Sequence, residues 1–208
     1  MRKKEIGNLT GHLNPLDKEF YLNTDVAQVA KSLLGKYLIR NLNGHTFIAL
    51  ISETEAYRGR DDKACHAYQY KRTHRTEVMF SQGGIAYVYL IYGMYSMLNV
   101  VTNVTDEPDA VLIRGVLPVQ GFKEPVVAQK EDNEIIKKLN GPGKLCKTLK
   151  IDTGFNRHEL SKKPLWISHL PDTPEPLIEV STRIGIDYAE EDTLRPWRFI
   201  LNNGKEFL

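Results

Sequence analysis

The sequence from residue 46 to residue 57 reads TFIALISETEAY, an apolar run that ends in two acids and an aromatic residue. Its branched and aromatic residues favour a β-strand, and Tyr37 to Arg40 forms a second strand candidate just before it. The intervening Asn43-Gly44 is typical of a tight hairpin turn. Because side chains alternate along a strand, the two acids and Tyr57 are expected on one face.

The two acids, Glu53 and Glu55, would lie about 7 Å apart at the backbone on such a face. Carboxylates can act as general acids or bases, and two of them can also flank a glycosidic bond with a water molecule between them. Two solvated strand glutamates would give the same pattern. The apolar strand before the acids and the tyrosines after them favour a chemical role.

Aromatic residues are concentrated close to these acids, since seven of the ten tyrosines fall within the 39 residues from 57 to 95. Ile85 to Ile91 and Tyr95 to Val101 predict a second hairpin with Tyr92-Gly93-Met94 at its tip. An aromatic ring at such a turn is costly to expose unless it meets something apolar, such as a DNA base stack. The alternative is a ring that folds back on its own sheet.

Other elements are predicted from periodicity and turn residues. Asn23 to Gly35 has the apolar spacing of a helix, and Lys144 to Leu149 predicts a short helix after a glycine-rich break. Val111 to Arg114 is a short apolar strand that ends in a cation, and a buried guanidinium there would need Glu55 or Glu53 as its partner. A last strand is expected near Phe199, residues 170–176 are expected to form a loop, and nothing marks a domain boundary.

Composition is that of a single globular domain, with 208 residues, 41% of them hydrophobic, and a formal charge of +2. Residues 58–78 and 130–150 each carry six basic residues against three acidic ones. Such stretches suit a phosphate backbone, although charge runs are usually solvated faces. Two cysteines give no disulfide framework, and the chain shows neither a secretory signal nor a membrane span, so a cytoplasmic protein is expected.

Several chemical classes lack their motifs. Gly141-Pro142-Gly143-Lys144 lacks the first glycine and the Ser or Thr of a phosphate-binding loop. The run from His158 to Lys162 has Lys162 where a zinc protease has its second histidine, and no Gly-x-Ser-x-Gly is present. We therefore expect no metal and no cofactor.

The order and spacing of five motifs resemble those of the alkyladenine (3-methyladenine) DNA glycosylase family. The likeness runs from about Phe20 to Phe199, so residues 20–208 are expected to form one catalytic domain and residues 1–19 a flexible N-terminal segment. The matching motifs are Glu53-Thr54-Glu55-Ala56-Tyr57 with His66, Tyr87-Val88-Tyr89-Leu90-Ile91-Tyr92-Gly93-Met94-Tyr95, Asn99, Val111-Leu112-Ile113-Arg114 and Gly141-Pro142-Gly143-Lys144-Leu145-Cys146.

The resemblance implies a mixed α/β (α+β) fold, a single compact domain with a curved, mainly antiparallel sheet, flanking helices and a protruding hairpin that enters the DNA minor groove. By position, Glu55 would be the general base and Arg114 would help to hold the attacking water. In the pocket, Tyr57, His66 and Tyr89 would stack on the extruded base, and Asn99 would exclude guanine. Tyr92 would be the wedge that enters the duplex. The other residues expected to contact DNA are Met94, Tyr95, Arg72, Arg75 and Lys144.

The function implied is that of a monomeric, monofunctional enzyme of base excision repair. It would flip alkylated, and also deaminated, purines out of double-stranded DNA and leave an abasic site. It would not cleave the strand, because the matched motifs put no lysine in the pocket to form a Schiff base. Two alternatives remain open at this point. One is a hydrolase of free nucleosides, which would have no use for Tyr92, and the other is a non-catalytic binder of distorted DNA.

Overall fold

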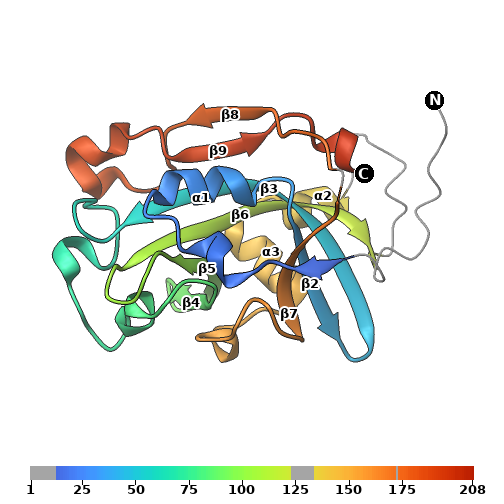
Figure 1. The fold of residues 1–208 in the computed structure, drawn as a ribbon, viewed down its shortest axis with the longest axis horizontal. Coiled ribbons are helices and arrows are strands. Elements are labelled where there is room, and N and C mark those ends of the chain that lie inside the picture. The colour runs from blue at the N-terminus through green and yellow to red at the C-terminus, as the bar shows by residue number, and fades with distance from the viewer. Residues whose placement is uncertain (1–12, 123–133, 172) are drawn as a thin grey trace.

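A long antiparallel pair, β3 (His45–Arg58) and β6 (Asp109–Gln120), runs through the middle of the fold. The computed structural model describes residues 13–122, 134–171 and 173–208. Within these residues the sheet has the order β1-β7-β2-β3-β6-β5-β4, with β9 paired to β3 and β8 paired to β9 (Figure 1). The other strands are β1 (Asn14–Pro15), β2 (Tyr37–Leu42), β4 (Ala86–Ile91), β5 (Tyr95–Thr102), β7 (Leu165–His169), β8 (Ile178–Ser181) and β9 (Arg198–Leu201).

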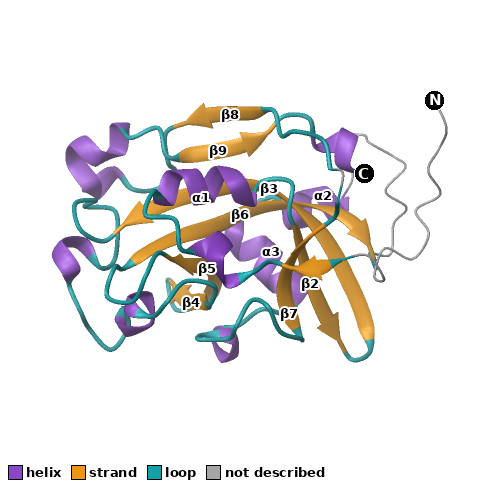
Figure 2. Ribbon diagram, in the orientation of Figure 1, coloured by secondary structure: helices purple, strands orange, loops and turns teal. Residues whose placement is uncertain are grey.

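The sheet is antiparallel at each of these pairings and is curled rather than flat (Figure 2). Two strands share one edge of β3, because β2 pairs with residues 45–50 and β9 pairs with residues 53–55. In Figure 1, β8 and β9 accordingly lie along the top of the view, apart from β2. The half of β3 that carries the acids is therefore paired on both sides, by β6 and by β9.

Three α-helices accompany the sheet in the described residues: α1 (Val26–Leu33), α2 (Glu134–Leu139) and α3 (Pro142–Leu149). Asp25 caps α1 by accepting hydrogen bonds from the backbone N–H groups of residues 27 and 28. The hydroxyl of Thr54 donates to the carbonyl of Ala30 at 2.9 Å, which ties α1 to the face of β3 opposite the acids. None of the described helices is long and apolar enough to cross a membrane.

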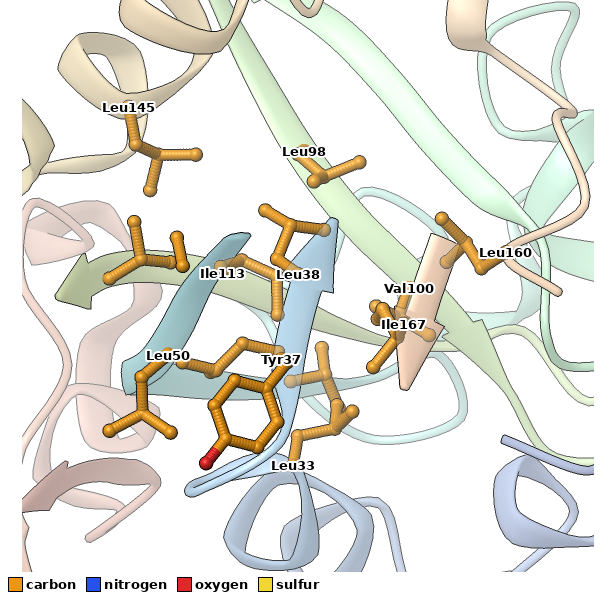
Figure 3. Packing of buried hydrophobic residues seen from close by; sticks show 14 of the residues in the cluster. Leu33, Tyr37, Leu38, Leu50, Leu98, Val100, Ile113, Leu145, Leu160 and Ile167 are labelled. Atoms are coloured by element: carbon orange, nitrogen blue, oxygen red, sulfur yellow. The ribbon is translucent and has the colours of Figure 1, made fainter. Parts of the chain in front are cut away.

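The main core lies on that opposite face of the sheet. Ala56, Val111 and Ile113 alternate with the residues of the acid face and are fully buried. Burial of each large apolar side chain stabilises a fold by about 1.5–3 kcal/mol. Figure 3 shows part of this packing and labels Leu33, Tyr37, Leu38, Leu50, Leu98, Val100, Ile113, Leu145, Leu160 and Ile167.

The structure confirms the fold class and the two predicted hairpins. Asn43 and Gly44 have φ angles of 52° and 79°, and Tyr92 and Gly93 have φ angles of 52° and 68°. Two consecutive residues with positive φ are the signature of the tight hairpin turn that matches strand twist. The predicted helix over 23–35 is α1, and the predicted C-terminal strand is β9.

Some boundaries differ from the expectations. The strand predicted over 111–114 is the middle of the 12-residue β6, whose continuation past Gly115 was not recognised. The short helix predicted from Lys144 starts two residues earlier, with Pro142 in its first turn, where a missing N–H costs nothing. Strands β7 and β8 were not predicted. Of the segment expected to be flexible, Asn14 and Pro15 pair with β7, and residues 1–12 lie outside the described residues.

Candidate active site

One row of directly paired residues crosses five strands and brings distant parts of the sequence together. Arg198 of β9 is opposite Glu55 of β3, which is opposite Leu112 of β6. Leu112 is in turn opposite Asn99 of β5, and Asn99 is opposite Tyr87 of β4. Residues directly opposite in antiparallel strands have their side chains on the same face. The register therefore places the acid, the amide and an aromatic ring on one surface.

Neighbouring rows extend this surface. Tyr57 pairs with Ala110 on one side of the central row, and Tyr89 pairs with Met97 on the other. All four line a cavity of about 280 Å³, a size near the lower end for small-molecule sites. The sheet thus forms one wall of the cavity.

Two segments close the cavity from outside the sheet. One runs from Ala64 to Met79 and the other from Ile184 to Tyr188. Figure 1 shows both stretches at the left end of the view, although more than a hundred residues separate them in the sequence. Pro142, at the start of α3, also contributes to the lining.

Glu55 lies directly behind the cavity wall and has no exposed surface. Its Oε2 accepts a hydrogen bond from the hydroxyl of Tyr57 at 2.7 Å, and its Oε1 accepts one from the backbone N–H of Ile184 at 2.8 Å. Arg114 Nη1 is 3.4 Å from the same Oε1. Burial raises the pKa of Glu55, while Arg114, Tyr57 and Ile184 act in the opposite direction. The three contacting residues all line the cavity.

Glu53 is held differently. Its Oε1 accepts from Arg114 Nε at 3.0 Å and from Arg198 Nε at 2.6 Å. Ser52 and Arg114 are left out of the pairing between β3 and β6 because the register shifts on either side of Glu53. Such irregularities re-aim side chains, and this one lets Arg114 reach both acids. The charge argument from the sequence is therefore confirmed: Arg114 has carboxylate partners.

The aromatic residues expected to stack on a base gather on the cavity. The rings of His66 and Tyr89 are 4.7 Å apart in an edge-to-face arrangement, and His66 Nδ1 is 2.9 Å from the hydroxyl of Tyr87. Burial, and then the charge of Arg75, lower the pKa of His66 to about 4. His66 is therefore neutral at pH 7. Burial also raises the pKa of Tyr57 and of Tyr89.

Asn99, the residue expected to discriminate against guanine, is 4% exposed and lines the cavity. Its amide nitrogen donates to the carbonyls of Tyr87 at 3.2 Å and of Met97 at 3.4 Å. These two bonds fix the plane of the amide against the sheet. A rigid group at this position can act as a steric limit.

The hairpin residues expected to meet DNA are exposed. Tyr92, Met94 and Tyr95 have 83%, 66% and 46% of their surface exposed, and Tyr92 also borders the cavity. Tyr95 packs against Gly143 so closely that a Cβ added to that glycine would lie 3.2 Å from the Cβ of Tyr95. This contact connects the hairpin to α3. A cluster of exposed apolar groups at the mouth of a cavity is typical of a binding surface.

The three cations expected at DNA have different surroundings. Arg75 lines the cavity, with its guanidinium over Tyr89. Arg72 pairs with Glu77 at 2.8 Å and with Asp106 at 2.9 Å. Lys144 borders a separate surface hollow together with Lys138, Lys147 and Lys150. The structure therefore does not bring these three side chains to one place.

Sequence reasoning missed the segment that begins at Arg183. The Arg183 side chain is fully buried, pairs with Asp62 and stacks over Tyr57, with its Cζ 4.9 Å from the ring centroid. The next residue, Ile184, donates to Glu55, and Gly185 follows with a φ of 75°. The one available signal was an arginine before a branched residue and a glycine. That pattern is too common to identify a site.

No cluster of three or more His, Cys, Asp or Glu side chains is arranged to hold a metal ion in the part of the chain that the structure describes. A buried carboxylate behind an aromatic-walled cavity is typical of the class of proteins that bind a flat ring and perform acid–base chemistry beside it.

Comparison with known proteins identifies the family within this class. The profile of the methylpurine-DNA glycosylase family matches residues 19–205. A Chlamydia abortus protein provisionally named 3-methyladenine DNA glycosylase is 47% identical over 188 residues, which cover 90% of this chain and 98% of that protein. A protein of the same name from Natranaerobius thermophilus is 46% identical over 90% of this chain, and one from Clostridium botulinum is 44% identical over 91% of it. Each alignment covers 96% of the relative's own length.

The chain belongs to the methylpurine-DNA glycosylase family. Membership implies hydrolysis of N-glycosyl bonds with DNA as the substrate. The family and the names of the relatives support a 3-methyladenine or methylpurine DNA glycosylase that acts in DNA repair.

Proposed function

We propose that this protein flips N-alkylated purines out of duplex DNA into the cavity between Tyr57 and the pair His66 and Tyr89, and hydrolyses the N-glycosidic bond with Glu55 as general base. The product is an abasic site with an intact sugar–phosphate backbone. The single observation that carries the proposal is the position of Glu55, fully buried and hydrogen-bonded directly behind three residues of the cavity wall.

The chemistry needs one carboxylate and one water molecule. The water oxygen forms a bond to C1′, the C1′–N bond breaks with its electron pair going to the purine, and Glu55 takes the proton from water. Positive charge develops on the sugar as the bond breaks, and a carboxylate beside it stabilises that charge. With a cationic purine, the departing electron pair neutralises the ring, so no acid is needed.

Access to Glu55 places a condition on this mechanism. The side chain has no exposed surface, and Tyr57, Arg114 and Ile184 lie between it and the cavity. The wall formed by Arg114 and Ile184 must open by the width of a water molecule when DNA binds. We propose that Arg114 then holds the attacking water, since Glu53 anchors the same guanidinium through Nε.

The exposed hairpin favours duplex DNA over a free nucleoside as substrate. A large ring that is 83% exposed, at a turn with positive φ, is costly unless it meets an apolar surface. Proteins that extrude a nucleotide insert such side chains into the stack, at a cost of a few kcal/mol for unstacking each step. We propose that Tyr92 fills the place of the extruded base from the minor groove, and that the enzyme acts as a monomer.

The test is product analysis on two substrates, a duplex that contains one 7-methylguanine and free 7-methyl-2′-deoxyguanosine. We expect release of the free base from the duplex, no release from the nucleoside at the same enzyme concentration, and a strand that breaks only after alkali treatment. Faster release from the nucleoside would instead identify a nucleoside hydrolase. A strand cut without alkali would show lyase chemistry, which the proposed mechanism excludes.

A further inference from the structure

Arg75 contributes a guanidinium group to the wall of the cavity. Its Cζ lies 4.7 Å from the centroid of the Tyr89 ring, and its Nη2 donates to Nε2 of His66 at 3.3 Å. Because Nε2 accepts this bond, the proton of the neutral imidazole is on Nδ1, which faces the hydroxyl of Tyr87. Arg75 is thus in contact with two of the rings proposed to hold the extruded base.

The charge of Arg75 is not compensated at this place. The described residues that line the cavity include two arginines and no carboxylate. Arg114 is paired with Glu53 and Glu55, whereas no Asp or Glu of the described chain forms a salt bridge with Arg75. The cavity therefore presents one unpaired positive charge to whatever enters it.

This charge changes which bases the aromatic walls attract. A tyrosine face attracts a cation through the ring quadrupole, but the face of Tyr89 is already occupied by the guanidinium of Arg75. Arg75 is exposed in the free protein, and a purine that carries its own positive charge would be repelled by it where the two meet at the cavity. A neutral purine is not repelled, and an acceptor atom on its edge can bind the donors of the arginine fork.

The same charge acts on bond cleavage. A neutral purine gains negative charge as it takes the electron pair of the C1′–N bond, and a nearby guanidinium stabilises that charge. A cationic purine is still partly positive in the transition state. Arg75 therefore raises the free energy of that transition state relative to free enzyme and free DNA. Both effects appear in kcat/KM, which compares the transition state with the free reactants.

We propose that Arg75 is a specificity-determining residue that favours neutral over cationic damaged purines in this site. The inference rests on the proposed function, because it assumes that the base enters this cavity. It assigns to Arg75 a contact with the base, in place of the DNA backbone contact expected from the sequence.

The experiment measures kcat/KM for release of 7-methylguanine, a cationic base, and of hypoxanthine, a neutral one, from duplexes of otherwise identical sequence. Wild-type protein is compared with Arg75→Met, Arg75→Lys and Arg157→Met. The last variant removes an exposed arginine that does not line the cavity and so controls for net charge. All measurements use one salt concentration, because DNA affinity depends steeply on salt.

We expect Arg75→Met to raise the ratio of 7-methylguanine to hypoxanthine release by about tenfold, which corresponds to about 1.4 kcal/mol. Arg75→Lys should stay close to the wild-type ratio because it keeps the charge, and Arg157→Met should leave the ratio unchanged. An equal fall for both bases in Arg75→Met would show a phosphate contact and overturn the inference. An unchanged ratio would overturn it as well. Release of neither base by the wild-type protein would contradict the proposed function itself.

Discussion

The central residue is Glu55, whose environment balances two opposed effects on its pKa. Complete burial raises the pKa, whereas the charge of Arg114 and the hydrogen bonds from Tyr57 and Ile184 lower it. The net direction is upward from the ordinary value of a glutamate. A general base must be deprotonated to act, so base release should fall on the acid side of this raised pKa.

Tyr57→Phe tests that balance, because it removes one hydrogen bond to the carboxylate and keeps the aromatic ring in the wall. Without this donor the charged form of Glu55 is less stable, and its pKa rises further. The acid limb of kcat/KM for 7-methylguanine should therefore move to higher pH, with rates close to wild type on the alkaline side. A limb that stays in place or moves to lower pH would contradict the role given to Glu55. The cationic substrate is chosen because its release needs no proton.

From residues alone, the site could be predicted where its members share a strand, and at Arg114, where a buried cation needs a carboxylate partner. The alternation along β3 predicted a common face for Glu53, Glu55 and Tyr57. In the structure Tyr57 lines the cavity and binds Glu55, while Glu53 binds Arg114, another residue of the cavity wall. Leu112 lies opposite Glu55, and Asn99 lies opposite Leu112, through the register of β6 and β5, which no local pattern encodes. The resemblance, rather than spacing, pointed to Asn99.

At the scale of elements, the β4–β5 hairpin and the segment after Arg183 give contrasting results. The hairpin has a local signal, an aromatic followed by glycine between two strand-forming runs, and it was predicted with its tip at Tyr92. The segment that starts at Arg183 has no such signal, because its position depends on a buried partner, Asp62, 121 residues earlier. Strand β6 was predicted too short because its pattern is interrupted at Arg114 and Gly115.

Tyr92→Ala tests the hairpin. The variant removes the exposed ring, so kcat/KM on alkylated duplex should fall by more than about tenfold, since filling the base stack is worth a few kcal/mol. Urea unfolding should show little change, because the ring makes few native contacts at 83% exposure. Leu177→Ala is the control, an exposed leucine outside the cavity with 61% of its surface exposed. Equal effects of the two substitutions on duplex activity would contradict a specific role for Tyr92.

At the scale of the whole molecule, one buried ion pair joins the loop that follows β3 to the segment that begins at Arg183. The side chains of Arg183 and Asp62 are both fully buried, and the guanidinium also donates to the carbonyls of Ala56 and Asp192. Arg183 also lies over Tyr57, while the next residue, Ile184, binds Glu55. The fold therefore connects the stability of this end of the molecule with the geometry of its carboxylate.

Asp62→Asn should lower the free energy of unfolding by about 3–5 kcal/mol, the usual cost of leaving one buried charge without its partner. The measurement is urea unfolding at pH 7. Asp61→Asn is the matched control, because its carboxylate is 46% exposed and bound to Arg58, and such a surface pair is worth about 0–1 kcal/mol. A loss of less than about 1 kcal/mol in Asp62→Asn would show that the pair does not hold this segment in place.

The most direct test of the account is Glu55→Gln, measured for binding and for turnover on the same duplex with one 7-methylguanine. The amide keeps the size of the side chain but cannot take a proton from water. We expect the dissociation constant for the duplex to stay within about threefold of wild type, a change of less than about 1 kcal/mol. Single-turnover release of the base should fall by at least about a thousandfold, or about 4 kcal/mol in the barrier. Base release within about tenfold of wild type would contradict the assignment of Glu55 as the general base.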